Sequence, residues 1–278
     1  MHLEDQRICS HASKSALGLI EIRYEAGLSK NRLPYHSRWH TESVIRRAAM
    51  IADAICVDDR SKMLAHVAAA FHDVVHERGA PQGENEWQSV VDFQFWVPSL
   101  ALIEAKLSDA EQALVKEAIL ATSVSWSAEH QTIIQPNLMP DSDPVVRAVA
   151  MADIGSPGME PDDFEKGSDL LFAERETDIM LALELSDGQD WVPKPLQNEY
   201  IARYVKWKET QLLFAKSRKA LFETELGNLA DGRNRMRALF SHFDESIDIA
   251  DNHVLRARTI RFDELAALLM PNKFSAEA

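Results

Sequence analysis

The stretch AAAFHDVVHERG, residues 68–79, joins an apolar run of helix-forming residues to a polar end that carries the doublet His72-Asp73. His76 follows one helical turn later. Adjacent helical residues point about 100° apart, so they rarely share one role on a solvated surface. They can share a metal ion, because the ion is compact and both imidazole and carboxylate bind first-row divalent metals. The doublet is therefore a candidate metal site at the end of a buried helix, and the alternative is a histidine that interacts with the helix dipole beside a solvated aspartate.

Two ligands do not complete a metal site, so further ligands are expected on neighbouring helices. His40 lies near the start of the preceding predicted helix, and Asp153 closes the apolar segment VVRAVAMAD. Asp141 and Asp143 compete for the last position. Asp143 is better explained as an N-cap, because Pro144 follows it at the first helical position.

Helical periodicity extends over the whole chain and predicts an all-α bundle. Ser61 is expected to cap the third helix, and Ser108 with Glu111 forms an S-x-x-E capping box. Residues 131–139 are the only strand candidate. The predicted helices span approximately residues 13–27, 40–55, 61–73, 85–96, 108–122, 144–153, 162–185 and 196–270.

Composition limits the classes of partner and compartment. A net charge of -14 over 278 residues argues against non-specific binding to nucleic acid or an anionic membrane. Cys9 and Cys56 form no CxxC pattern, so we expect a reducing, cytoplasmic environment. No segment has the length and apolarity of a signal peptide core or a membrane span. The sequence leaves open whether the chain forms a homo-oligomer.

Three segments together resemble the H…HD…D pattern of the HD-domain superfamily of metal-dependent phosphohydrolases. They are YHSRWH (35–40), AAFHDVVHERGAPQGENEWQS (69–89) and VAMAD (149–153). The chain is similar to a bacterial subgroup of predicted phosphohydrolases, with a YHN-type motif and an Asn-Glu-x-x-Ser stretch, here Asn85, Glu86 and Ser89. The subgroup's LDxD-like motif corresponds here to AMAD, residues 150–153. The resemblance covers roughly residues 20–185, which implies an HD-domain core over 1–185 and a helical C-terminal extension over 186–278.

The resemblance implies that His40, His72, Asp73 and Asp153 bind one divalent metal. Two imidazoles and two carboxylates suit Mn, Fe, Co, Ni or Zn better than Mg, which prefers oxygen ligands. The implied activity is hydrolysis of a small phosphate ester, such as a nucleotide, by a metal-activated water.

Three further residues are candidates for catalytic roles. Glu77 follows the doublet, where some HD proteins place a carboxylate that activates water. His76 is an alternative, as a proton donor to the leaving group, since histidine titrates near neutral pH. Glu86 is expected to accept a hydrogen bond from His72 and orient its ring, as metal-bound histidines commonly require. A helix-dipole role also explains Glu86.

Three residues near the first motif are candidates for substrate binding. Arg32 and Arg38 flank the motif, and their guanidinium groups suit a phosphate. His36 lies four residues before His40, so the two could share a helix face. His36 is then expected to contact the substrate or to orient His40. Each of the three is also consistent with an ordinary surface residue.

Two other functions remain open. An HD-fold di-iron oxygenase needs two more histidine ligands, and between the doublet and Asp153 only His76 and His130 are present. His130 is on no clear helix, so one metal is favoured. The third alternative is a regulatory module that keeps the metal without turnover. The basic residues between Lys206 and Lys219 are interpreted as a solvated helix face rather than a nucleotide contact.

Overall fold

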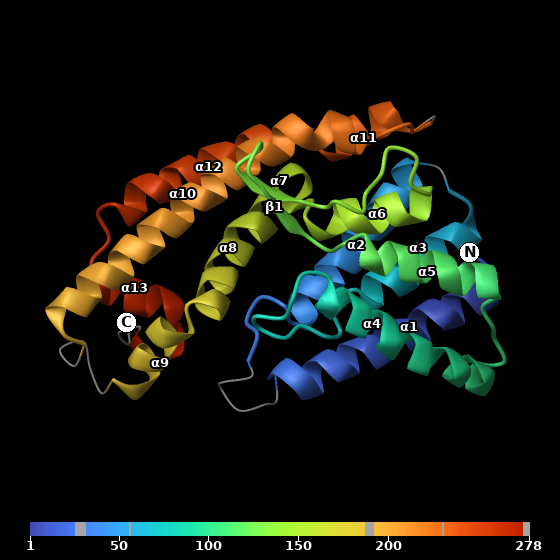
Figure 1. The fold of residues 1–278 in the computed structure, drawn as a ribbon, viewed down its shortest axis with the longest axis horizontal. Helices are drawn as coiled ribbons and strands as arrows, with labels where there is room; N and C mark the ends of the chain where they lie inside the picture. The colour runs from blue at the N-terminus through green and yellow to red at the C-terminus, as the bar shows by residue number, and fades with distance from the viewer. Residues whose placement is uncertain (26–31, 56, 187–191, 230, 275–278) are drawn as a thin grey trace.

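A computed structural model describes residues 1–25, 32–55, 57–186, 192–229 and 231–274. It confirms the all-α prediction, because these residues form helices and one two-stranded antiparallel sheet (Figure 1). The sheet pairs β1 (Ser125–Ser127) with β2 (Thr132–Ile134). The α-helices are α1 (Leu3–Ile20), α2 (Arg38–Ala54), α3 (Asp59–Phe71), α4 (Glu84–Trp96), α5 (Asp109–Leu120), α6 (Pro144–Asp153), α7 (Ser156–Met159), α8 (Pro161–Arg175), α9 (Thr177–Leu185), α10 (Lys194–Glu225), α11 (Arg233–Leu239), α12 (Phe243–Ala257), α13 (Phe262–Leu269) and α14 (Pro271–Phe274).

The helix caps largely follow the sequence signals. Ser108 closes its capping box at the start of α5, and Asp143 accepts a hydrogen bond from the Val145 N–H at the start of α6. The predicted cap at Ser61 is wrong, because Asp58 caps α3 by accepting the Ser61 N–H at 2.8 Å. Ser61 is therefore the third residue of α3 rather than its cap.

The first helix also differs from its prediction. α1 begins at Leu3 rather than near residue 13, and a π-helical turn, Glu21–Glu25, continues it. Residues 26 and 27 of the predicted span lie outside the described residues.

The centre of the N-terminal body is formed by α3 and α6, which are apolar on nearly every side. α3 packs against α1, α2, α5 and α6, and α6 packs against α2, α3 and α5. Alanines at positions 65, 68, 69 and 70 are fully buried. Because these side chains are small, neighbouring helices can approach α3 closely. The C-terminal ends of α3 and α6 are thereby held in one core.

A second body lies beside the first. Phe172 and Ile179 from α8 and α9 share an apolar cluster with Tyr204 and Trp207 from α10. Figure 1 shows α10 and α12 packed side by side, extending from the α1–α6 body to α9 and α13. The predicted division at residue 185 stays a prediction, although this cluster takes residues from both sides of it.

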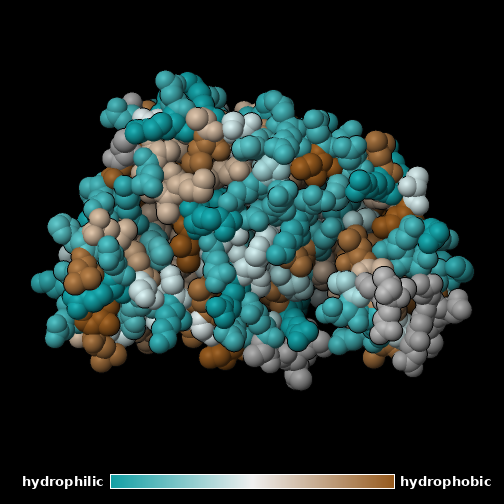
Figure 2. Space-filling view, turned by 180° about the vertical axis from the view of Figure 1, so that it is seen from behind, coloured by the Kyte–Doolittle hydropathy of each residue, from teal (hydrophilic) through white to brown (hydrophobic). Residues whose placement is uncertain are grey.

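The surface and the cysteines add three observations. The face seen in Figure 2 is mostly hydrophilic, with hydrophobic side chains scattered over it. Among the described helices, none combines the length and apolarity that crossing a bilayer requires. Cys9 is a buried free thiol, and burial raises its pKa to about 11. Cys56 lies outside the described residues.

Candidate metal centre

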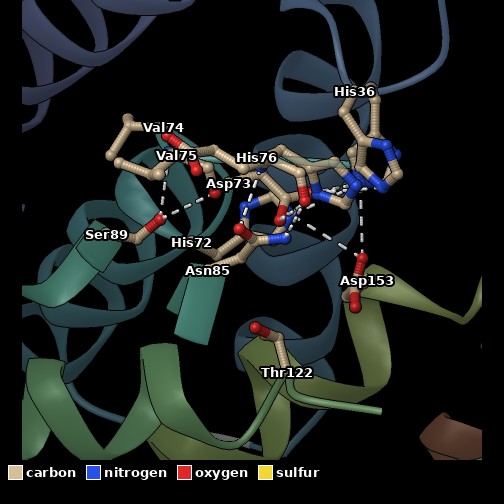
Figure 3. A network of polar contacts seen from close by, with 12 residues as sticks. His36, His72, Asp73, Val74, Val75, His76, Asn85, Ser89, Thr122 and Asp153 are labelled. Atoms are coloured by element: carbon tan, nitrogen blue, oxygen red, sulfur yellow. Dashed lines mark hydrogen bonds and ion pairs between the residues drawn. The ribbon is translucent and has the colours of Figure 1, made fainter. Parts of the chain in front are cut away.

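The doublet follows directly after α3. His72 is the C-cap residue of the helix, and its Nδ1 lies 2.8 Å from the Ala69 carbonyl oxygen. Asp73 is the next residue, and both are buried in the core. His72 and Asp73 therefore leave the helix where a change of direction lets both side chains face the same point (Figure 3).

The loop after the doublet is held by side chains that satisfy its backbone. Ser89 accepts the Val75 N–H at 3.1 Å, and the Tyr24 hydroxyl accepts the His76 N–H at 2.7 Å. Asn85 accepts the Glu77 N–H at 2.9 Å and donates to the Glu77 carbonyl at 3.3 Å. These hydrogen bonds fix the backbone of the loop, so the Asn-Glu-x-x-Ser stretch has a structural role as a clamp on it.

The end of α6 is fixed in a similar way. Arg47 is 2% exposed and donates from Nε to the Ala152 carbonyl at 2.7 Å. A Cβ at Gly155 would lie 2.2 Å from the Met151 carbonyl oxygen, so only glycine permits the turn that follows Asp153. Asp153 is thereby held at the last position of its helix, facing α2 and α3.

His40, His72, Asp73 and Asp153, called here the first group, converge from three segments of the chain. His40 Nε2 lies 3.3 Å from His72 Nε2, 3.3 Å from Asp73 Oδ2 and 3.3 Å from Asp153 Oδ1. His72 Nε2 lies 3.0 Å from Asp73 Oδ2 and 3.6 Å from Asp153 Oδ1. The sequence prediction that these four residues lie together is confirmed.

These spacings fit the edges of a coordination shell. Ligands about 2.0–2.2 Å from one ion are separated by about 3.0 Å at a right angle and about 3.4 Å at a tetrahedral angle. In the neutral tautomer of His72, Nδ1 donates to the Ala69 carbonyl, so Nε2 directs a lone pair into the group. Two nitrogens and two oxygens thus form a donor set suited to a transition metal.

Electrostatics also favour a positive charge inside the first group. Burial alone would lower the pKa of His72, but the carboxylates of Asp73 and Asp153 raise it well above its usual value. Burial alone would raise the pKa of both carboxyls, but the imidazoles hold that of Asp73 well below its usual range and lower that of Asp153 to about 2. Both carboxylates are therefore ionised at neutral pH and can bind a cation.

His36, Asp73 and His76 form a second group that shares Asp73 with the first. The rings of His36 and His76 are stacked, with centroids 3.4 Å apart and planes 15° apart. Glu174 lies beside them, with Oε1 2.5 Å from His36 Nδ1. Burial alone would raise the pKa of Glu174, but His36 lowers it to about 2.

Several predicted positions need correction. His36 shares no helix face with His40, because α2 begins only at Arg38. Glu86 does not orient His72, since His72 Nδ1, the nitrogen that faces away from the first group, is already hydrogen-bonded to the Ala69 carbonyl. Glu86 nevertheless lies near the first group: burial, followed by the charges of Asp73 and Asp153, raises its pKa.

The remaining candidates lie toward the surface. Glu77 is exposed, and its contact with the clamp uses backbone atoms rather than its carboxylate. Arg38 pairs with Glu21 at 2.9 Å instead of facing the first group. Arg32 is exposed, and its carbonyl accepts a hydrogen bond from Arg78. A substrate contact at Arg32 stays a prediction.

His130 and the C-terminal basic residues lie apart from both groups. The His130 N–H donates to Ser127 in the β1–β2 hairpin, and its carbonyl accepts from Ser217. Lys208 and Arg218 are buried in ion pairs, with Asp169 and Glu225 respectively. The interpretation of these basic residues as a solvated face is therefore correct only for their exposed members.

Glu174 is the residue that sequence reasoning missed. It lies on α8, is 3% exposed, and accepts the backbone N–H groups of both Tyr35 and His36 at 3.1 Å. Gly167 on the same helix brings α8 close to Tyr35, because a Cβ there would lie 3.0 Å from the ring. No local motif marks Glu174, since its role depends on the packing of α8 against the loop before α2.

No protein-family model matches the sequence, and no curated protein or solved structure matches the chain. The likeness to HD phosphohydrolases therefore stays a prediction from the sequence, and the chemistry of the site is inferred from its geometry.

Proposed function

We propose that this chain is a metal-dependent phosphoric ester hydrolase of the HD class. The observation that carries the proposal is the first group: His40, His72, Asp73 and Asp153 present four ligand atoms within 4.8 Å of one another. The residues come from three helix ends, which is how a helical bundle can surround one ion. Mn, Fe, Co, Ni and Zn suit this donor set.

A divalent ion bound there would lower the pKa of water and polarise a phosphorus–oxygen bond. The protein's own residues would orient the ligands and supply the proton for the leaving group. His72 and Asp73 are held by α3 and the clamp, so the donors stay oriented. His76, whose side chain is 24% exposed, borders the first group and is our candidate for protonating the leaving oxygen. Glu86 is the nearby carboxyl with a raised pKa and is a second candidate.

The proposed substrate is a small phosphorylated molecule, such as a nucleotide, rather than a nucleic acid. The net charge of -14 supports this choice, because polyanions need an extended basic surface. Arg32 remains the candidate for phosphate binding. Arg78 joins it, because it is exposed and two backbone carbonyls, of Arg32 and Glu174, hold its guanidinium at the border of the second group. A cytoplasmic location is part of the same proposal.

The decisive experiment combines metal analysis with a phosphoester screen. Metal-free protein is loaded with each candidate metal and assayed on nitrophenyl phosphates and nucleotides. Asp153→Asn should lose both metal and hydrolysis, whereas Asp143→Asn should keep both, because asparagine still caps α6. Stoichiometric metal without turnover on any phosphoester would favour the regulatory module, and no bound metal would refute the proposal.

The di-iron oxygenase is a second candidate, favoured by one observation. The second group provides two histidines beside Asp73: His76, which the sequence already offered for a second metal, and His36, which precedes the doublet. Iron-loaded protein should then consume oxygen stoichiometrically with an organic substrate. Hydrolysis that proceeds unchanged without oxygen would exclude this candidate.

A further inference from the structure

The orientation of His36 is fixed by Glu174. The carboxylate Oε1 lies 2.5 Å from Nδ1, and Oε2 accepts the His36 backbone N–H at 3.1 Å. A buried carboxylate on one ring nitrogen makes that nitrogen the donor and leaves a lone pair on the other. His36 Nε2 therefore directs a lone pair away from Glu174.

The carboxylate of Asp73 lies near this second ring nitrogen. His36 Nε2 lies 4.0 Å from Asp73 Oδ2. This separation is too long for a hydrogen bond. The separation does fit two ligands of one ion with a wide ligand–metal–ligand angle. With metal–ligand bonds of about 2.0–2.2 Å, two ligands on opposite sides of an ion are up to about 4.4 Å apart.

His76 lies near the other oxygen of the same carboxylate. Its Nδ1 lies 4.0 Å from Asp73 Oδ1. Its ring is stacked on His36, and one ion cannot lie in the planes of two parallel rings. His36 is held by Glu174, and His76 is the more exposed of the two, with 24% of its side chain accessible against 14%. His76 must therefore be the ring that turns when an ion binds.

We propose that His36, His76 and Asp73 bind a second divalent cation, with Asp73 bridging the two sites. Glu174 acts as the residue that positions His36. Two imidazoles and a carboxylate suit the same transition metals as the first group. The proposal differs from the expectation of one metal, which considered only histidines between the doublet and Asp153. The inference rests on the proposed function in one respect, because Asp73 is also a ligand of the first site. With His76 as a ligand of the second ion, Glu86 is the candidate that protonates the leaving oxygen.

The test is a Mn²⁺ titration of metal-free protein, with bound metal counted after gel filtration and followed by electron paramagnetic resonance. Wild type should bind two ions per chain, and the second equivalent should produce a spin-coupled signal because one carboxylate bridges the pair. His36→Ala and His76→Asn should each bind one ion, without spin coupling. Glu174→Gln should weaken only the second ion, by roughly 10- to 100-fold.

His130→Ala is the matched control and should bind two ions, since His130 lies in the β1–β2 hairpin. Circular dichroism checks that each variant is folded, and two histidine variants are used so that one unfolded protein does not decide the result. A wild type that saturates at one ion per chain refutes the second site alone. A wild type that binds none refutes both the second site and the proposed function.

Discussion

Glu174 holds His36 across 138 residues of sequence, through one contact to the imidazole and one to the backbone. The loop before α2 therefore depends on α8 for its position. Because α2 carries His40, this contact also connects α8 to the first group. The binding of metal and the packing of α8 should accordingly be coupled.

Removing the metal should lower thermal stability. An ion that binds only the folded chain adds about 2.7 kcal/mol at 100 times its dissociation constant. Wild type should therefore melt at a higher temperature with Mn²⁺ or Zn²⁺ than with a chelator. His72→Ala should reduce this difference, because it removes a ligand of the first group, whereas His66→Ala, which alters a histidine bonded to Ser13, should retain it in full. Equal shifts in both variants would place the ion elsewhere.

Arg47 and Arg46 provide a matched pair for testing the support of Asp153. Both contact Glu160, but Arg47 is 2% exposed at its side chain and Arg46 is 50% exposed. Arg47→Met leaves the Ala152 carbonyl without its Arg47 donor and removes one of the two guanidinium groups that pair with Glu160, so it should cost about 1.5–3 kcal/mol. Arg46→Met should cost about 1 kcal/mol or less.

Denaturant unfolding measures both Arg47 and Arg46 variants, and metal content should fall only in Arg47→Met. Equal destabilisation by the two substitutions would contradict the proposed role of the buried guanidinium.

The lowered pKa of Glu111 predicts that part of the folding stability is lost in acid. Hydrogen bonding from Arg60, opposed by burial, lowers the pKa of Glu111 from 4.5 to about 2. A folded-state pKa below the unfolded value adds stability above pH 4.5, and this contribution is lost as the pH falls toward 2. Glu111→Gln keeps an oxygen for the Ser108 N–H but removes the charge, so it should cost about 1 kcal/mol at pH 7.

The difference between Glu111→Gln and wild type should disappear near pH 2, measured by thermal unfolding across pH. Glu117→Gln, an exposed position on the same helix, is the control and should show no such trend. A difference that persists at low pH would assign the effect to packing instead.

Substitutions of the two arginines near the first motif should differ in their effect on substrate binding, because the contacts of the two side chains differ. Arg38 is already paired with Glu21, so Arg38→Met should leave metal content and the KM for a phosphoester unchanged. Arg32→Met should raise KM by roughly 10- to 100-fold, the value of a charge-assisted contact to phosphate. If neither variant changes KM, Arg78 becomes the candidate for phosphate recognition.

The four residues of the first group could be predicted because each is a local feature of the sequence. His72 and Asp73 end an apolar helix, and Asp153 ends another, so both positions can be read from periodicity. His40 was a candidate from its place near the start of the preceding predicted helix, and the resemblance to the H…HD…D pattern implied that the four bind one metal. Four residues on three helix ends could be expected to converge once an all-α core was inferred.

The rest of the site depends on long-range packing. Glu174 lies in an unremarkable helical segment, and nothing near it in sequence indicates its contact with His36. The pairing of Arg38 with Glu21 could not be predicted from the sequence either. Arg38 was a candidate for phosphate binding, but the π-helical turn brings the Glu21 carboxylate beside its guanidinium. Glu86 failed as an orienter because a backbone carbonyl three residues before His72 took its place.

One consequence of the fold concerns how the chain unfolds. α10 has 32 residues, or about 48 Å of helix. Along it, Trp207, Ala215 and Phe222 belong in turn to three separate apolar clusters. A helix that contributes to every cluster cannot lose its hydrogen bonds in one place without weakening packing in the others. The amides at its centre should therefore exchange with solvent only when the whole molecule opens. We expect a single cooperative transition, in which the C-terminal helices and the metal-binding helices lose their structure together.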